Sequence, residues 1–222
     1  MAAKRPPKRR RPGAEATRRR LLRAGRRAFS RRGLAGANLR EEILRPARVS
    51  VGSFYHQFID KTDLLLQILQ EHAAAVRRQR AKALPVPARS FEALAAHAYG
   101  LILSLAEADP DLWRIQARER WSDAPRIRRF LRDERQCWID WLCEEQKRLP
   151  GRSRARARRE RLSGYLLGLA GASADARLEL PRRERGGSGI EALARFTAAG
   201  AAGPRPVEQR RPAGGGARRQ RG

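Results

Sequence analysis

Apolar residues recur three and four positions apart along most of the chain, which is the spacing of one face of an α-helix. Almost no stretch alternates apolar and polar residues as a half-buried strand would. The pattern therefore predicts an all-α protein of about nine helices. The first helix should run from Ala14 to Arg32, with Gly33 just past its end as a C-terminal cap.

A second, short helix is expected from Leu39 to Arg45. Asn38 to Glu41 resembles a capping box, in which the Asn38 side chain accepts from a backbone N–H and Glu41 reaches back. Pro46 should stop this helix, because proline lacks an N–H and disfavours helical geometry in the preceding residue.

The segment from Ser50 to Phe58, SVGSFYHQF, is expected to form a third helix with Ser50 as its N-cap. Val51, Phe54 and Phe58 are spaced three and four apart, so they can face inward together. The opposite face is polar and carries Ser53, His56 and Gln57. A tight turn between the second and third helices then makes a helix-turn-helix in a three-helix head, with a face that fits a DNA major groove.

A larger helical region follows the head, and segments rich in proline or glycine divide it. Two terminal stretches, residues 1–13 and 200–222, are rich in arginine with proline or glycine and lack apolar periodicity. We expect both to be disordered tails.

Charge changes the picture by suggesting a partner. The 222 residues have a formal net charge of +27 and a pI near 11.7, which favours a polyanionic partner, either nucleic acid or an anionic membrane surface. The arginine excess is spread over the whole chain, so a compositional bias explains part of it.

Other classes of protein find little support. No apolar stretch follows the basic N-terminus, and the longest apolar run, residues 165–174, is far shorter than the roughly 20 residues of a membrane span. We therefore expect a soluble, cytoplasmic protein. Cys137 and Cys143 make neither a disulfide framework nor a zinc site, so no cofactor and no metal are expected.

A set of residues from the first helix to the start of the fourth has the order and spacing of a known family. These residues are Phe29, Gly33, Val49, Ser50, Gly52, Ser53, Phe54, Tyr55, Phe58, Lys61, Asp63, Leu64 and Leu65. Through them, residues 17–70 resemble the TetR family of bacterial transcriptional regulators.

The resemblance implies DNA contacts. Tyr55 would contact the phosphate backbone, Lys61 would add a phosphate contact, and His56 would lie at or next to base edges. Gly52 removes side-chain bulk where the helix approaches the DNA backbone. The whole predicted DNA-binding set is Ser50, Val51, Gly52, Ser53, Tyr55, His56, Gln57 and Lys61. Arg18 and Arg19 could add attraction that is independent of sequence.

The chain departs from the family at two positions. Arg48 stands where the family usually has glycine, and a left-handed conformation there would cost about 1 kcal/mol or more. The turn is then either strained at Arg48 or reshaped by Pro46. Arg40 stands where the family prefers an apolar residue, and Leu39 beside it could take that role.

The resemblance also divides the chain. It implies a DNA-binding domain at residues 14–62 and a ligand-binding and dimerisation domain at residues 63–199, whose last two helices would pair with those of a second copy. Aromatic residues in this body are candidates for an effector pocket, although apolar spacing already explains each of them as core, which is the favoured interpretation. They are Tyr99, Trp113, Trp121, Trp138 and Trp141.

The sequence thus predicts a homodimeric TetR-like regulator, in such families most often a repressor, which a small-molecule effector releases from a palindromic operator. One alternative is a charge-driven nucleic-acid-binding protein without sequence preference. A helical enzyme is disfavoured, because the sequence has no phosphate-binding loop, dinucleotide fingerprint, nucleophile elbow or metal-binding helix motif.

Overall fold

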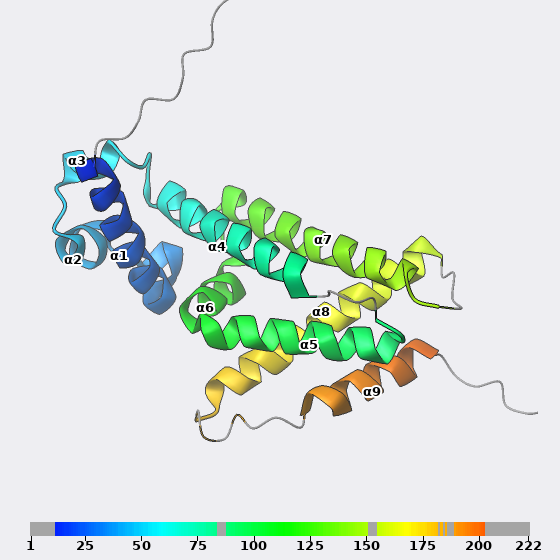
Figure 1. The fold of residues 1–222 in the computed structure, drawn as a ribbon. Coiled ribbons are helices and arrows are strands. Elements are labelled where there is room, and N and C mark those ends of the chain that lie inside the picture. Colours follow the sequence, from blue (N-terminus) through cyan, green and yellow to red (C-terminus); the bar gives the residue numbers. More distant parts are fainter. Residues whose placement is uncertain are drawn as a thin grey trace, which may run out of the picture.

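The computed structural model describes residues 12–83, 88–150, 155–181, 183, 185 and 189–202. Within these ranges every regular element is a helix, which confirms the predicted all-α fold. Figure 1 shows a small head at one end of a longer helical body. The predicted tails lie largely outside the described residues, although the first helix already begins at Pro12 and the last ends at Ala202.

The head consists of α1 (Pro12–Gly36), η1 (Leu39–Leu44), α2 (Arg45–Ala47) and α3 (Val51–Tyr55). Gly33 interrupts the helical geometry of α1 with φ 70° and ψ 176°, so the predicted helix end at this glycine is confirmed. A Cβ atom there would lie 2.8 Å from Arg118 Cδ, which adds a steric reason for glycine to the conformational one.

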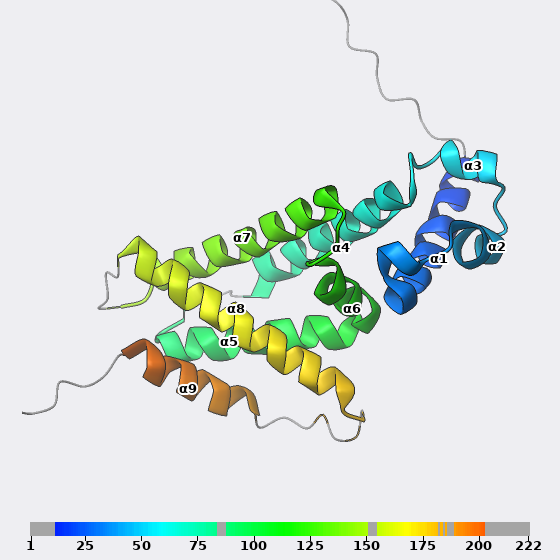
Figure 2. The same ribbon diagram turned by 180° about the vertical axis from the view of Figure 1, so that it is seen from behind.

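The body consists of α4 (Lys61–Ala83), α5 (Phe91–Ala108), α6 (Pro110–Glu119), α7 (Pro125–Lys147), α8 (Arg156–Glu179) and α9 (Gly189–Ala202). In Figures 1 and 2, α4 leads away from the head and runs alongside α7, while α6 lies between the body and the end of α1. Helix α8 crosses α5, and α9 lies along α5 at the far side.

One hydrophobic cluster joins the head to the base of the body. Phe29, Phe54 and Phe58 from the head pack in it with apolar residues at the start of α4. The cluster also contains Leu112 and Ile115 of α6, as well as Ile127 of α7. The head is therefore packed into the body rather than tethered to it.

A second cluster forms the core of the body, between α5, α7, α8 and α9. Tyr99 of α5 is fully buried there, and its hydroxyl shares a hydrogen bond of 2.6 Å with Thr197 Oγ1 of α9. Burial raises the pKa of Tyr99, so its hydroxyl stays protonated and available for this bond. The bond helps fix α9 against α5.

Among the described residues, no helix is long and apolar enough to cross a membrane. The same residues contain no group of three or more His, Cys, Asp or Glu side chains that could hold a metal ion. Cys137 is an exposed free thiol and Cys143 a buried one.

Candidate nucleic-acid interface and body cavity

Helix η1 begins at a side-chain cap on Asn38. Asn38 Oδ1 accepts from the backbone N–H groups of Arg40 and Glu41, at 3.0 and 3.1 Å. The carboxylate that reaches back to the Asn38 N–H, at 2.9 Å, belongs to Glu42 and not to the predicted Glu41. The capping box is thus present with a different acidic partner.

The sequence predicted that this helix stops at Pro46, and that prediction is wrong. The helix continues as α2 to Ala47, with the proline in the first turn of α2. The N–H of Arg45 donates to the Arg40 carbonyl five residues back, so η1 is wound more widely than an α-helix. We attribute the tolerance of Pro46 to this wider winding, which relieves the clash between the proline ring and the preceding turn.

The turn between α2 and α3 depends on Arg48, which has φ 53° and ψ 51°. Arg48 is the one non-glycine residue with positive φ in the described part of the chain. The sequence left open whether the turn is strained at Arg48 or reshaped by Pro46, and the structure has the strained, left-handed Arg48. The turn therefore keeps the geometry of a glycine at the cost of strain in an arginine.

Helix α3 begins at Ser50, whose Oγ accepts from the Ser53 N–H at 3.2 Å, as predicted for an N-cap. The regular helix ends at Tyr55, shorter than expected, although the Phe58 N–H still donates to the Phe54 carbonyl at 2.9 Å. This last bond turns Phe58 back toward the head.

The two faces of α3 are clearly divided. Phe54 and Phe58 are 0% and 2% exposed and stack with ring centroids 5.7 Å apart. Val51 is 40% exposed, so its predicted inward orientation is wrong. Tyr55 is 57% exposed and rests edge-on against Phe54, which holds its ring upright at the surface.

The other predicted contact residues differ in exposure. Gly52 and His56 are exposed on α3 and at its end, and no atom lies within 4 Å of a Cβ built on Gly52. Ser53 and Gln57 are half-buried, and Ser53 Oγ accepts from Ser50 Oγ at 2.9 Å. The free surface of α3 therefore centres on Val51, Gly52, Tyr55 and His56.

Lys61 at the start of α4 has a structural role that the sequence did not suggest. Its Nζ donates to the backbone carbonyls of Ala35 and Ala37, each at 3.2 Å. It thereby ties the end of α1 to the start of α4. One of its three N–H donors remains for a phosphate group.

Helix α1 contributes a positive surface whose arginines mostly lack an acidic partner among the described residues. It contains eight arginines, of which Arg18, Arg26 and Arg32 form ion pairs with other elements. Arg18 is bound to Glu71 and Gln67, so it is less available to DNA than the sequence suggested. The remaining five are exposed and lie within about a third of the helix circumference. They are Arg19, Arg20, Arg23, Arg27 and Arg31.

The body contains a cavity of about 230 Å³ between α4, α5, α6, α7 and α8. Trp113 and Trp138 line it, as predicted for an effector pocket. Tyr99, Trp121 and Trp141 do not: Tyr99 lies in the core against α9, Trp121 is 80% exposed, and Trp141 packs edge-on against Trp138. The pocket prediction is corrected at these three residues.

Several polar residues of the cavity wall were missed as ligand contacts. They are His72, Asp109, Gln116, Arg120, Glu134, Arg135 and Asp175. Burial is the largest influence on His72 and lowers its pKa, while Asp109 opposes this shift, so the imidazole is neutral at pH 7. Helical spacing places His72 on the apolar face of α4, which does not distinguish a ligand contact from a core residue.

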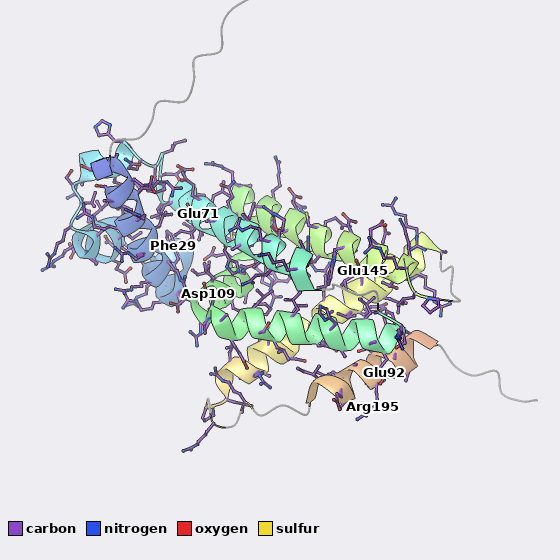
Figure 3. The ribbon with its side chains drawn as sticks, viewed as in Figure 1. Phe29, Glu71, Glu92, Asp109, Glu145 and Arg195 are labelled. Carbon is purple, nitrogen blue, oxygen red and sulfur yellow. The ribbon has the colours of Figure 1, made fainter. Side chains whose placement is uncertain are left out.

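The cavity borders directly on the contacts between body and head. Asp109 lines the cavity and forms an ion pair with Arg26 of α1. Figure 3 shows Asp109 at the end of the body nearest to the head. Beyond it, Ser30 Oγ donates to Asp111 at 2.8 Å, and the Leu34 N–H donates to the buried Glu119 carboxylate, also at 2.8 Å. The three acceptors, Asp109, Asp111 and Glu119, all lie on α6 or at its N-cap.

Known proteins share both parts of this architecture. Residues 21–68 match the family described as "Bacterial regulatory proteins, tetR family". No curated protein is significantly similar to the chain in sequence.

The similar solved structures share the fold over most of the chain. A TetR-like transcriptional regulator from Rhodococcus sp. RHA1 is 20% identical, with 89% of this chain and 100% of that one covered and a TM-score of 0.66. A putative TetR-family regulator from Syntrophomonas wolfei is 17% identical, with 87% of this chain and 98% of that one covered and a TM-score of 0.64. The fatty acid degradation regulator FadR of Bacillus halodurans is 16% identical, with 88% of this chain and 97% of that one covered and a TM-score of 0.63.

Replacing Arg48 by glycine should stabilise the protein, because glycine adopts the left-handed conformation without a steric cost. We expect the free energy of unfolding to rise by about 1 kcal/mol, measured by urea denaturation followed by circular dichroism. The matched control is Arg45→Gly at a residue with φ −62°, which should lower stability. A loss of stability in Arg48→Gly would contradict the observed turn.

Proposed function

We propose that this chain, which belongs to the TetR family of bacterial regulatory proteins through its helix-turn-helix head, represses transcription as a homodimer on a palindromic operator. A small molecule in the body cavity would release it from the DNA. Binding to chromosomal DNA would place the protein in the bacterial cytoplasm, in association with the nucleoid. The observation that carries the proposal is the division of α3 into a buried aromatic face and an exposed face.

The exposed face of α3 has the chemistry that a major groove requires. Tyr55 presents a hydroxyl on a ring held by Phe54, which suits a phosphate oxygen. His56 offers ring nitrogens to base edges, and the methyl groups of Val51 suit the methyl group of thymine. Gly52 allows close approach of the DNA backbone.

We propose the same contact residues as the sequence predicted, with Tyr55 and His56 as the principal ones. The full set is Ser50, Val51, Gly52, Ser53, Tyr55, His56, Gln57 and Lys61. The five exposed arginines of α1 add attraction that is independent of sequence and weakens with salt. That attraction alone is the alternative function, a charge-driven nucleic-acid-binding protein. A capped helix with a free polar face favours the regulator.

Dimerisation has a candidate surface on α8 and α9. Tyr165 and Leu169 of α8 are 64% and 36% exposed, and Phe196 of α9 is 70% exposed. Exposed small residues separate them, including Gly168 and Ala172 on α8 and Ala192 and Ala199 on α9. We propose that these faces pair with their copies around a two-fold axis, which would present two heads to half-sites about 34 Å apart.

Release of the operator would act through α6. This helix lines the cavity with Trp113, Gln116 and Ala117 and holds α1 through Asp111 and Glu119. A ligand that shifts α6 therefore changes the position of the head. For this to release DNA, the ligand must bind the arrangement that cannot bind the operator more tightly than the one that can.

The division of the chain follows from the same proposal. We propose a DNA-binding domain at residues 14–62 and a ligand-binding and dimerisation domain at residues 63–199. The shared core of α1, α4 and α6 means that the two act as one packed unit even though their functions differ.

Tyr55→Phe should weaken operator binding on the order of a hundredfold, because each of the two protomers loses a hydrogen bond of about 1.5 kcal/mol to a charged phosphate oxygen. The loss should be similar for all DNA sequences, measured by fluorescence anisotropy on an operator selected from random duplexes. Trp121→Phe changes an exposed aromatic residue of the body, outside the proposed DNA contacts and dimer faces, and should bind normally. Equal affinities for the two variants would contradict the role of Tyr55.

Leu169→Arg combined with Phe196→Arg should convert the dimer into monomers, because four arginines would meet across a small two-fold interface. Sedimentation equilibrium gives the mass directly. Trp121→Arg changes an equally exposed aromatic residue outside α8 and α9 and should remain a dimer. A double variant that stays dimeric would place the interface elsewhere.

A further inference from the structure

We infer that the effector is an amphipathic anion, an apolar chain that ends in a carboxylate, and that Arg120 and Arg135 hold its charged end. This inference rests on the proposed function, because it assigns the chemistry of the ligand that releases the operator. It follows from which charges of the cavity wall already have partners within the protein.

The three carboxylates of the wall are all engaged. Asp109 is paired with Arg26, and Glu134 is paired with Arg77. Asp175 accepts a hydrogen bond of 2.6 Å from Trp113 Nε1. A cationic ligand would have to displace one of these partners before it gained a carboxylate of its own, so the wall does not favour a cation.

The two arginines of the cavity wall, in contrast, are not held by an oppositely charged partner among the described residues. Arg120 only faces the Trp121 ring, 6.0 Å from its centroid, and Arg135 donates to the neutral Gly164 carbonyl at 3.4 Å. Neither forms a salt bridge with a carboxylate in the described part of the chain. Their charges are therefore available to a ligand anion.

The exposure of the wall residues sets the direction of the ligand. Arg120 and Arg135 are exposed, so they lie where the cavity opens to solvent. The deeper wall is apolar and includes Leu69, Ile102 and Phe130. A chain that extends into the cavity with its charged end at the opening satisfies both environments.

The volume limits the size of the ligand. At about 230 Å³, the cavity is somewhat smaller than the roughly 300–1,000 Å³ of sites for drug-sized ligands. A short or medium-length carboxylate suits this volume better than a bulky polycyclic molecule.

The position of Arg120 connects this chemistry to regulation. Arg120 is the C-terminal cap residue of α6, and Gln116 lies one turn before it on the same helix. The preceding residue, Glu119, holds the Leu34 N–H of α1. A carboxylate bound to Arg120 therefore acts on the last turn of α6, next to its bond with the head.

The test compares three probes that share one chain and differ in the end group: octanoate, octanol and octylamine. Isothermal titration of the full-length protein should show octanoate binding more tightly than the other two. Arg120→Gln and Arg135→Gln should each weaken octanoate about fivefold, the effect of one exposed ion pair, and leave octanol within about twofold. Arg128→Gln and Arg132→Gln, exposed arginines of α7 outside the cavity, are the matched controls.

Two outcomes would overturn the inference: tighter binding of octylamine than of octanoate, or equal losses for octanoate and octanol in the Arg120 and Arg135 variants. Binding of the selected operator without ligand is measured separately. Specific operator binding combined with either outcome would reject the anionic effector and keep the regulator. Absence of specific operator binding would reject the proposed function, whatever the probes do.

Discussion

The hydrogen bond from the Leu34 N–H to the Glu119 carboxylate fixes how the head sits on the body. Glu119 is 3% exposed, so loss of its donor would leave a carboxylate buried without that partner, at a cost of about 1–3 kcal/mol or more. The bond exists because α1 turns at Gly33, where the backbone is left-handed and a side chain would collide with Arg118. One glycine and one buried carboxylate thus set the orientation of a DNA-binding head.

Because α6 carries Glu119, it is the element on which the two activities meet. One side of it contributes Trp113 and Gln116 to the cavity, while Glu119 and the capping residue Asp109 hold α1. The hydrophobic cluster shared by head and body makes independent movement of the head costly. A change at the cavity therefore has few ways to relax that do not move α1, which would be the physical basis of the proposed coupling between ligand binding and DNA binding.

Helical periodicity was enough to predict the fold, the buried faces of Phe54 and Phe58, and the end of α1 at Gly33. It was wrong at Val51, since Phe54 is the one residue of the five in α3 that is buried. The wide winding of η1 moved the capping partner to Glu42 and accommodated Pro46, and apolar spacing does not reveal such winding. Trp121 fell outside the cavity because α6 ends at Glu119, beyond which helical spacing has no meaning. Cavity residues such as Asp109 and Glu134 depend on contacts between distant helices.

In the proposed function, α3 reads a DNA sequence and the positive charge of α1 only adds to the affinity. The most direct test is the affinity of the full-length protein for its selected operator and for a random duplex of equal length, across a salt series. We expect both affinities to fall with salt while binding to the operator stays at least about a thousandfold tighter. Equal affinities at every salt concentration would contradict the proposed function and leave a protein that binds DNA by charge alone.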